Sequence, residues 1–187
     1  MEEGNYIQSK ETAENLKNEA NKEYSKGHYN LAIEKYTQGI YSCPKEENRL
    51  LSILHSNRAA CHINLDNLDA GLIDSNDAIQ FDNEYPKGYL RRFTILEKKE
   101  KWHDALKDIN KAFELDENLK VDQKLVARQK RVEKLSSELF EKEKGEMLGK
   151  LKDFGNMVLG KVGLSLDNFQ VEKNPDSGSY NIQFKQN

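Results

Sequence analysis

Cysteine is scarce in this chain of 187 residues, and long apolar runs are absent. Its two cysteines, Cys43 and Cys61, have no CxxC spacing. They therefore build no disulfide framework and fit a reducing compartment. No window approaches the roughly 20 apolar residues that span a bilayer, and the acidic start MEEGNYIQSK lacks the apolar core of a secretory signal. We expect a soluble, cytoplasmic protein without direct membrane insertion.

The chain also lacks a strong excess of charge of either sign. Its 29 Lys and Arg residues nearly balance its 32 Asp and Glu residues, and the formal net charge is −3. Such a balance provides no global attraction to nucleic acid or to a membrane surface. Nucleic acid is therefore not an expected partner, and any recognition of an anion has to be local.

Motifs of catalysis are missing as well. The sequence has no phosphate-binding glycine loop, no GxSxG and no HExxH. His55 and His62 lie seven residues apart, close to Cys61, but nothing indicates a third or fourth metal ligand. We interpret them as ordinary buried or surface histidines, and we expect no enzyme, no cofactor and no metal.

What remains is a helical composition with an internal repeat. Proline occurs only at 44, 86 and 175, and the stretch before residue 150 is rich in Leu, Ala, Glu and Lys. Aligned with itself, the chain shows a 34-residue register. The units are 13–46, 52–85 and 86–119, with an insertion at 47–51 and an N-terminal extension at 1–12.

Within each unit, small and large residues recur at fixed positions. Position 20 is Ala32, Gly71 and Ala105, and position 27 is Gly39, Ala78 and Ala112. Large residues at positions 4, 17 and 24 fill the space between, and turn signals at 25–29, 65–69 and 98–102 divide each unit in two. The pattern predicts helix–turn–helix units that bury their apolar faces by stacking on one another.

This pattern resembles the tetratricopeptide repeat (TPR) family over about 107 residues. The resemblance implies an all-α, three-repeat superhelix. The chain departs from the family at Glu19, usually Leu, at Ser75, usually aromatic, and at Asn83 and Glu117, usually Pro.

The region after the repeats changes in character. The apolar residues Val121, Leu125, Val132, Leu135 and Leu139 predict an amphipathic capping helix over 120–144, since a free-standing coiled coil would need more heptads. The tail, 145–187, carries glycines at 145, 149, 155, 160 and 163, each of which costs about 1 kcal/mol inside a helix. We therefore expect the helix to end near 145 and a hairpin or extended segment to flank Asn-Pro-Asp-Ser-Gly.

One local charge pattern needs an explanation. In PKGYLRR, residues 86–92, cations crowd the first turns of a helix opened by Pro86, where the helix dipole disfavours them. In the repeat register, Lys87 and Arg91 share the concave face of the first helices with three further residues, Lys17, Asn21 and Asn57. Lysine, arginine and asparagine donors suit a carboxylate, whereas Arg92 falls outside the set and is interpreted as structural or solvated.

The KxxxN…N…KxxxR set resembles the carboxylate clamp of TPR co-chaperones. Those proteins hold the C-terminal Glu-Glu-Val-Asp tails of the heat-shock 70 and 90 classes of chaperone. The resemblance implies that Lys17, Asn21 and Asn57 hold the main-chain carboxylate, and that Lys87 and Arg91 reach the acidic side chain and backbone. An apolar ligand side chain would be sheltered by three groove residues, Tyr24, Ala60 and Phe93.

Other partners remain open at this point. The groove of such a fold can bind a different peptide, or it can be filled by this chain's own C-terminal segment or that of a second copy. The terminal KQN is not acidic, which argues against self-capture in the clamp. The apolar run MVLGKVGLSL can instead contact a second protein partner or mediate self-association.

Overall fold

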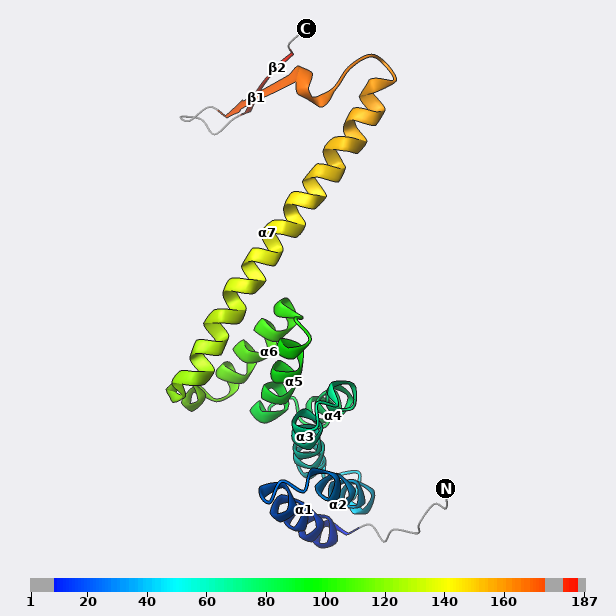
Figure 1. Cartoon of the computed structure of the whole chain (residues 1–187), viewed down its shortest axis with the longest axis vertical. Coiled ribbons are helices and arrows are strands. Elements are labelled where there is room, and N and C mark those ends of the chain that lie inside the picture. The colour runs from blue at the N-terminus through cyan, green and yellow to red at the C-terminus, as the bar shows by residue number, and fades with distance from the viewer. Residues whose placement is uncertain (1–8, 174–179, 185–187) are drawn as a thin grey trace. The chain divides into compact units, whose positions relative to one another are not determined.

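The computed structural model describes residues 9–173 and 180–184 (Figure 1). Their order along the chain is α1 (Lys10–Ser25), α2 (Tyr29–Ser42), α3 (Asn48–Asn64), α4 (Leu68–Phe81), α5 (Pro86–Lys98), α6 (Trp102–Leu115), a 3₁₀ turn η1 (Glu117–Val121), α7 (Gln123–Gly160), a 3₁₀ turn η2 (Leu166–Asn168), β1 (Phe169–Lys173) and β2 (Tyr180–Phe184). The predicted all-α, three-repeat architecture is confirmed. The chain divides into two compact units, Met1–Ser136 and Ser137–Asn187.

Each helix pair of the first unit turns in the same way. The second residue after the first helix has a positive φ in all three pairs, and it is Gly27, Asp66 and Glu100 in turn. The next residue donates its N–H to the carbonyl five positions back, which is the Schellman cap. These three bonds are His28 N to Glu23 O at 3.0 Å, Asn67 N to His62 O at 2.9 Å, and Lys101 N to Leu96 O at 2.9 Å. One backbone device thus closes every hairpin at the predicted turns.

Small residues allow the helices of the repeats to pack closely. Gly39 on α2 is the clearest case, because a Cβ there would lie 3.0 Å from Leu54 Cδ2 of α3. The alanines at equivalent repeat positions are fully buried, as the packing argument requires: Ala20, Ala32, Ala59, Ala78, Ala105 and Ala112. Residues 48–51 of the predicted insertion belong to the first helix of the second repeat, because α3 begins at Asn48.

In the second and third pairs, an arginine ties the first helix to its partner. Arg58 on α3 forms two hydrogen bonds with Asp74 on α4, at 2.6 and 2.9 Å. Arg92 on α5 repeats this arrangement with Asp108 on α6, at 2.8 Å for both bonds. Each arginine also reaches back to the preceding repeat, at Thr37 and Asn76. The structural interpretation of Arg92 is confirmed.

The start of α7 packs on the third repeat. Val132 is fully buried and Leu125 nearly so, in one cluster with Ile109 and Phe113. Arg128 lies over the Phe93 ring at 4.6 Å and hydrogen-bonds to Glu97 at 2.6 and 3.0 Å. Val121, predicted as part of this helix face, is instead 77% exposed at the end of η1.

The second unit corrects the prediction for the tail. The helix does not end near residue 145, because α7 continues through Gly145, Gly149 and Gly155 to Gly160. The glycines weaken a helix but do not forbid one, and their neighbours are good helix formers such as Leu, Lys, Glu and Met. At Gly155 the glycine has a packing role, since a Cβ there would lie 2.6 Å from Leu166 Cδ1 of the returning chain.

Beyond the helix, β1 and β2 pair as an antiparallel hairpin in which Phe169 faces Phe184 and Lys173 faces Tyr180. The Asn-Pro-Asp-Ser-Gly segment predicted to lie in this turn falls outside the described residues, as does most of the predicted N-terminal extension. None of the described helices combines the length and the apolar content that crossing a bilayer requires.

Candidate functional site

The five predicted site residues all lie on the first helices of the three pairs. Lys17 and Asn21 are on α1, Asn57 is on α3, and Lys87 and Arg91 are on α5. Helix α3 contacts both α1 and α5, so the three helices form one continuous layer. The repeat register alone was sufficient to place these residues on successive helices.

The structure brings two of these residues into direct contact. Asn57 Nδ2 donates to Asn21 Oδ1 at 3.2 Å. The same oxygen accepts a shorter hydrogen bond, 2.6 Å, from the hydroxyl of Tyr36 on α2. Tyr36 is 1% exposed, so its ring is held by the core while its hydroxyl reaches the site. Because Asn21 Oδ1 is engaged twice, the Asn21 amide can present its Nδ2 donors to a ligand.

Tyr36 is a site residue that sequence reasoning missed. Its repeat position was read as one that fills space between helices, and the ring does so. The only signal for a second role was the choice of tyrosine, because a buried phenol needs a hydrogen-bond partner. Burial raises the pKa of this phenol well above its ordinary value, although the nearby charge of Arg91 opposes the shift. The hydroxyl therefore stays protonated and acts as a donor.

Arg91 is the least satisfied cation of the site. Its Nε is buried and has no hydrogen-bond partner in the part of the chain that the structure describes. Burial raises the pKa of the Tyr36 and Tyr85 phenols and of the Cys61 thiol, and the charge of Arg91 opposes each of these shifts; the resulting pKa of Cys61 is about 12. The adjacent Arg92, in contrast, has a carboxylate partner in Asp108.

Neither lysine of the set is neutralised by a described neighbour. For Lys17 and Lys87, the described residues offer no hydrogen bond and no ion pair, and Lys87 is exposed. Elsewhere on α5, Lys98 pairs with Asp66 at 2.7 Å. Among the described residues, the predicted set thus contains three cations without a carboxylate partner, Lys17, Lys87 and Arg91, and a pair of oriented amides.

Of the three predicted apolar groove residues, one lies in the core and two remain candidates for contact with a ligand. Phe93 is fully buried in the core with Arg128 over its ring, so placing it in the groove is wrong. Its large side chain at a position otherwise held by alanine fills the space under α7. Ala60 is buried and Tyr24 is half-buried, and their contact with a ligand stays a prediction. Asn64, which sequence reasoning missed, donates to both of them, to Ala60 O at 2.8 Å and Tyr24 Oη at 3.1 Å.

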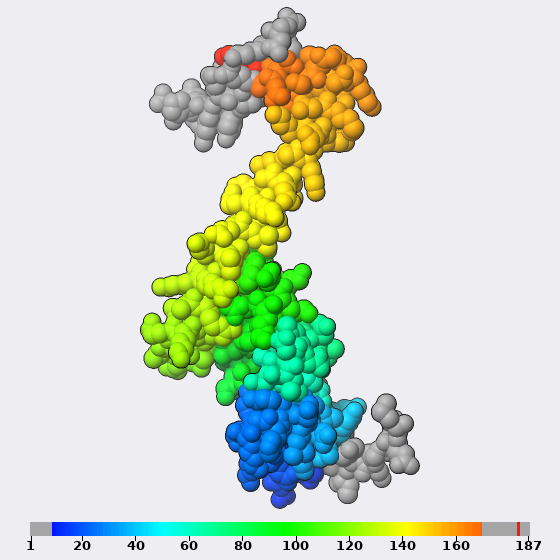
Figure 2. All heavy atoms as spheres, in the orientation of Figure 1, coloured from blue at the N-terminus to red at the C-terminus, as the bar shows by residue number. Residues whose placement is uncertain are grey.

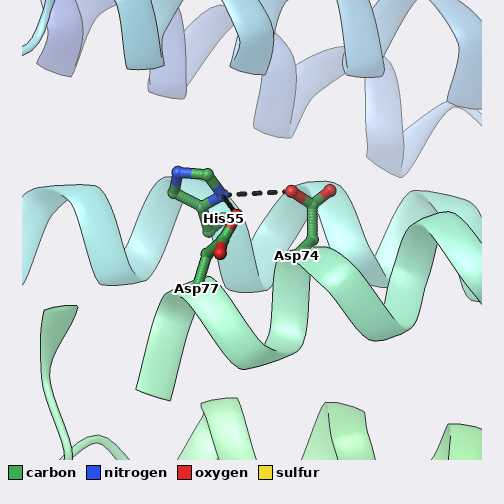
Figure 3. Close-up of side chains that lie close together, drawn as sticks. All are labelled: His55, Asp74 and Asp77. Carbon is green, nitrogen blue, oxygen red and sulfur yellow. Dashed lines mark hydrogen bonds and ion pairs between the residues drawn. The ribbon is translucent and has the colours of Figure 1, made fainter. Parts of the chain in front are cut away.

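A second polar cluster lies between α3 and α4, where His55 faces Asp74 and Asp77 (Figure 3). His55 Nδ1 is 3.0 Å from Asp74 Oδ1 and 3.5 Å from Asp77 Oδ2. Arg58 hydrogen-bonds both oxygens of Asp74, so a cation already occupies the place that a metal ion would need. The interpretation of His55 as an ordinary buried histidine fits this geometry.

The carboxyl group of Asp74 is held in its charged form. Burial alone would raise its pKa, but the hydrogen bonds and charges of His55 and Arg58 lower the pKa below its ordinary value. His62 lies two turns further along α3, and its Nε2 is 3.7 Å from Asp74 Oδ2. Burial lowers the pKa of His62, which favours the neutral ring at neutral pH.

Comparisons with known proteins bear on the repeats. No protein-family model matches the chain. It is 30% identical over 178 residues to small glutamine-rich tetratricopeptide repeat-containing protein 2 of Saccharomyces cerevisiae, covering 88% of this chain and 50% of that protein. It is 35% identical over 103 residues to the DnaJ homolog subfamily C member 7 homolog of Schizosaccharomyces pombe, covering 55% of this chain and 21% of that one. The chain therefore spans half or less of the length of these relatives.

Solved structures agree in fold. The first TPR of Spaghetti (RPAP3), bound to the HSP90 peptide SRMEEVD, has a TM-score of 0.62 and 25% identity, covering 72% of this chain and 99% of that one. The myosin chaperone UNC-45 from C. elegans, in complex with an Hsp90 peptide, has a TM-score of 0.60 and 27% identity, covering 67% of this chain and 14% of that one. Together with the 34-residue register and its buried small residues, these likenesses show that α1–α6 have the tetratricopeptide repeat fold.

Proposed function

We propose that this chain is a non-enzymatic adaptor whose TPR domain binds the free acidic C-terminus of another protein. The observation that carries the proposal is a set of donors on α1, α3 and α5 for which the described residues offer no carboxylate partner. Arg91 has a buried Nε with no partner among those residues, and Asn21 is oriented by Tyr36 and Asn57. An anion with two carboxylates satisfies such donors better than water does, because hydrogen bonds to charged groups are the stronger ones.

The ligand that we propose is the Glu-Glu-Val-Asp tail of the heat-shock 70 and 90 classes of chaperone. Two similar TPR domains support this choice. The first TPR of Spaghetti is bound to SRMEEVD, and the second TPR domain of human RPAP3, with a TM-score of 0.56 and 25% identity, is in complex with the HSP70 peptide SGPTIEEVD. Both peptides end in the same four residues.

The recognition would follow from the donors. The main-chain carboxylate accepts from Asn21, Asn57 and Lys17, and the aspartate side chain and backbone accept from Lys87 and Arg91. Lysine provides a mobile point charge and arginine a planar fork of donors, so the two lysines adapt to the ligand while Arg91 sets its orientation. Selection between the two chaperone classes would lie upstream of the last four residues.

A pair of peptides tests the proposal directly. Binding of Met-Glu-Glu-Val-Asp to the full chain is measured by calorimetry, once as the free acid and once as the C-terminal amide. We expect the acid to bind and the amide to bind at least tenfold more weakly, since the amide removes a charged acceptor worth about 1.5–3 kcal/mol. Equal affinity for the two peptides would refute carboxylate recognition.

Tyr36 allows a finer test of the site. Tyr36→Phe keeps the buried ring and removes only the hydroxyl that donates to Asn21 Oδ1. We expect the affinity for the free-acid peptide to fall about two- to tenfold, because one net hydrogen bond is worth about 0.5–1.5 kcal/mol. Tyr29→Phe, which removes a hydroxyl from an aromatic pair with Tyr24, is the matched control. A Tyr36→Phe variant with unchanged affinity would remove Tyr36 from the site.

Three further points belong to the same proposal. We propose that the protein works in the cytoplasm, where chaperone tails are available, and that its C-terminal segment contacts a further protein. We also propose a relation to tetratricopeptide repeat protein 1, because LKDFGNMVLGKVGLS (151–165) and the segment after it resemble the C-terminal end of that protein.

A further inference from the structure

The part of α7 that belongs to the second unit, residues 137–160, carries an uncovered apolar stripe. Its large apolar side chains are 48–71% exposed, and they are Phe140, Met147, Leu148, Leu151, Phe154, Met157 and Val158. These residues form the yellow to light-orange stretch in Figure 2. Side chains of this size seldom gather on one exposed helix face unless a partner covers them.

The spacing of the stripe is that of a helix pair. Phe140, Met147, Leu151, Phe154 and Val158 are separated by seven, four, three and four residues. This is the alternation of a and d positions in a two-helix coiled coil. The a position between Phe140 and Met147 is occupied by Lys144, whose ammonium pairs with Glu141 at 3.1 Å. A lysine at a single a position specifies pairing at some expense of stability.

The helix itself needs a partner. Gly145 and Gly149 are both inside α7, and each weakens a helix by about 1 kcal/mol relative to alanine. In proteins, most of the stability of a helix comes from packing of its apolar face rather than from intrinsic propensity. Burial of the stripe against a second helix offsets that loss, since each large apolar side chain buried contributes about 1.5–3 kcal/mol.

The charges on this helix identify the partner. Residues 138–146 carry four glutamates and two lysines, whereas residues 147–160 carry two lysines and one aspartate, and Lys161 follows directly after the helix. Two copies of the helix in antiparallel orientation therefore place an acidic half against a basic half at both ends. Parallel copies would place halves of like charge against each other. Lys152 also pairs with Asp167 at 2.7 Å, but this pair is solvent-exposed and therefore weak, so it competes little with a pairing to a second copy.

The returning chain leaves the stripe open. Leu166 packs on Gly155, and its N–H donates to Asn156 Oδ1 at 2.6 Å. Leu151, Phe154 and Val158 nevertheless stay 48–62% exposed. Leu166 therefore widens the apolar surface at its edge and does not cover it.

From these observations we infer that residues 137–160 form an antiparallel helix pair with a second copy of this chain. Each copy contributes the same stripe, as a two-fold interface requires. The interface would leave the TPR domain of each copy to bind a peptide, so that one dimer holds two acidic tails.

Oligomeric state tests the inference with a matched pair of variants. The mass of the full chain in solution is measured by sedimentation equilibrium over a range of concentrations. We expect a dimer for the wild type and a monomer for the double variant Leu151→Lys, Phe154→Lys. The control, Gly145→Lys with Gly149→Lys, adds the same two charges where nothing lies within 4 Å, and it should stay dimeric. A monomeric wild type, or loss of the dimer in both double variants, would overturn the inference.

Orientation needs a separate measurement. Spin labels are attached to Glu141→Cys and to Gly160→Cys, two positions about 28 Å apart at 1.5 Å per residue. Cys43 and Cys61 are buried, so labelling is confined to the new sites. In an antiparallel pair, each variant alone gives a separation of about 28 Å, and an equal mixture adds a much shorter one. A short separation within either variant alone indicates a parallel pair and contradicts the charge argument.

Discussion

Replacement of Arg91 by alanine should weaken binding of a free-acid Met-Glu-Glu-Val-Asp peptide about ten- to 100-fold, because a hydrogen bond to a charged group is worth about 1.5–3 kcal/mol. In the free protein the Arg91 Nε is buried without a partner. The guanidinium therefore gains its full complement of acceptors only when the ligand binds. Arg91→Lys keeps the charge and loses the planar fork, so its affinity should lie between those of the wild type and Arg91→Ala.

The stability of the same variant distinguishes a binding residue from a structural one. Removal of a half-buried cation whose buried Nε has no partner among the described residues relieves a desolvation penalty, so the free energy of unfolding of Arg91→Ala should equal or exceed that of the wild type. The neighbour Arg92 offers the opposite case, since it pairs with Asp108. Arg92→Ala should lower the free energy of unfolding while the folded protein keeps its affinity.

Calorimetry and urea unfolding of the two variants measure both quantities. Lys107→Ala, on the second helix of the third repeat, removes one positive charge away from the site and controls for net charge. If Arg91→Ala binds the peptide as the wild type does, or if it unfolds much more easily, Arg91 is a structural residue and the assignment is wrong.

Replacement of Asp74 by asparagine should lower the free energy of unfolding by about 3 kcal/mol, since loss of one partner of a buried ion pair leaves the other charge uncompensated. Asp74 is 2% exposed and accepts hydrogen bonds from Arg58 and His55. The asparagine is almost the same size, so the loss measures charge and hydrogen bonding and not a cavity. Asp77→Asn, at a half-exposed position of the same cluster, is the control and should have a small effect.

The effect of Asp74 should also depend on pH in one direction. The pKa of Asp74 in the folded protein lies below its ordinary value, which is about 3.8. Its contribution is therefore fully present above the unfolded pKa and is lost as the pH falls through the lower, folded pKa. We expect the difference in unfolding free energy between wild type and Asp74→Asn to be constant near neutral pH and to shrink below about pH 4. A difference that grows on acidification would contradict this assignment.

Much of the domain followed from periodicity. The recurrence of Ala32, Gly71 and Ala105 at one repeat position was sufficient to predict three stacked hairpins. A residue's place in a 34-residue repeat also determines its helix and its face, so the same register placed Lys17, Asn57 and Arg91 on successive helices. Local turn chemistry was less visible, because Asp66 and Glu100 take a left-handed conformation where only the first repeat has a glycine.

By itself, the amino-acid sequence determined the number of repeats, their boundaries to within a few residues, and the helices on which the donors lie. Only the tertiary structure decided which of those residues touch and which are buried. Phe93 lies in the core because α7 covers it, Asn21 is oriented because Tyr36 reaches it across the helix pair, and Arg91 differs from Arg92 because only Arg92 faces an aspartate. Helix α7 continues through Gly145, Gly149 and Gly155, although these glycines led to the prediction that the helix ends near residue 145. In each case the outcome depends on contacts between residues far apart in the chain, and a repeat pattern specifies the face of a helix but not what lies against it.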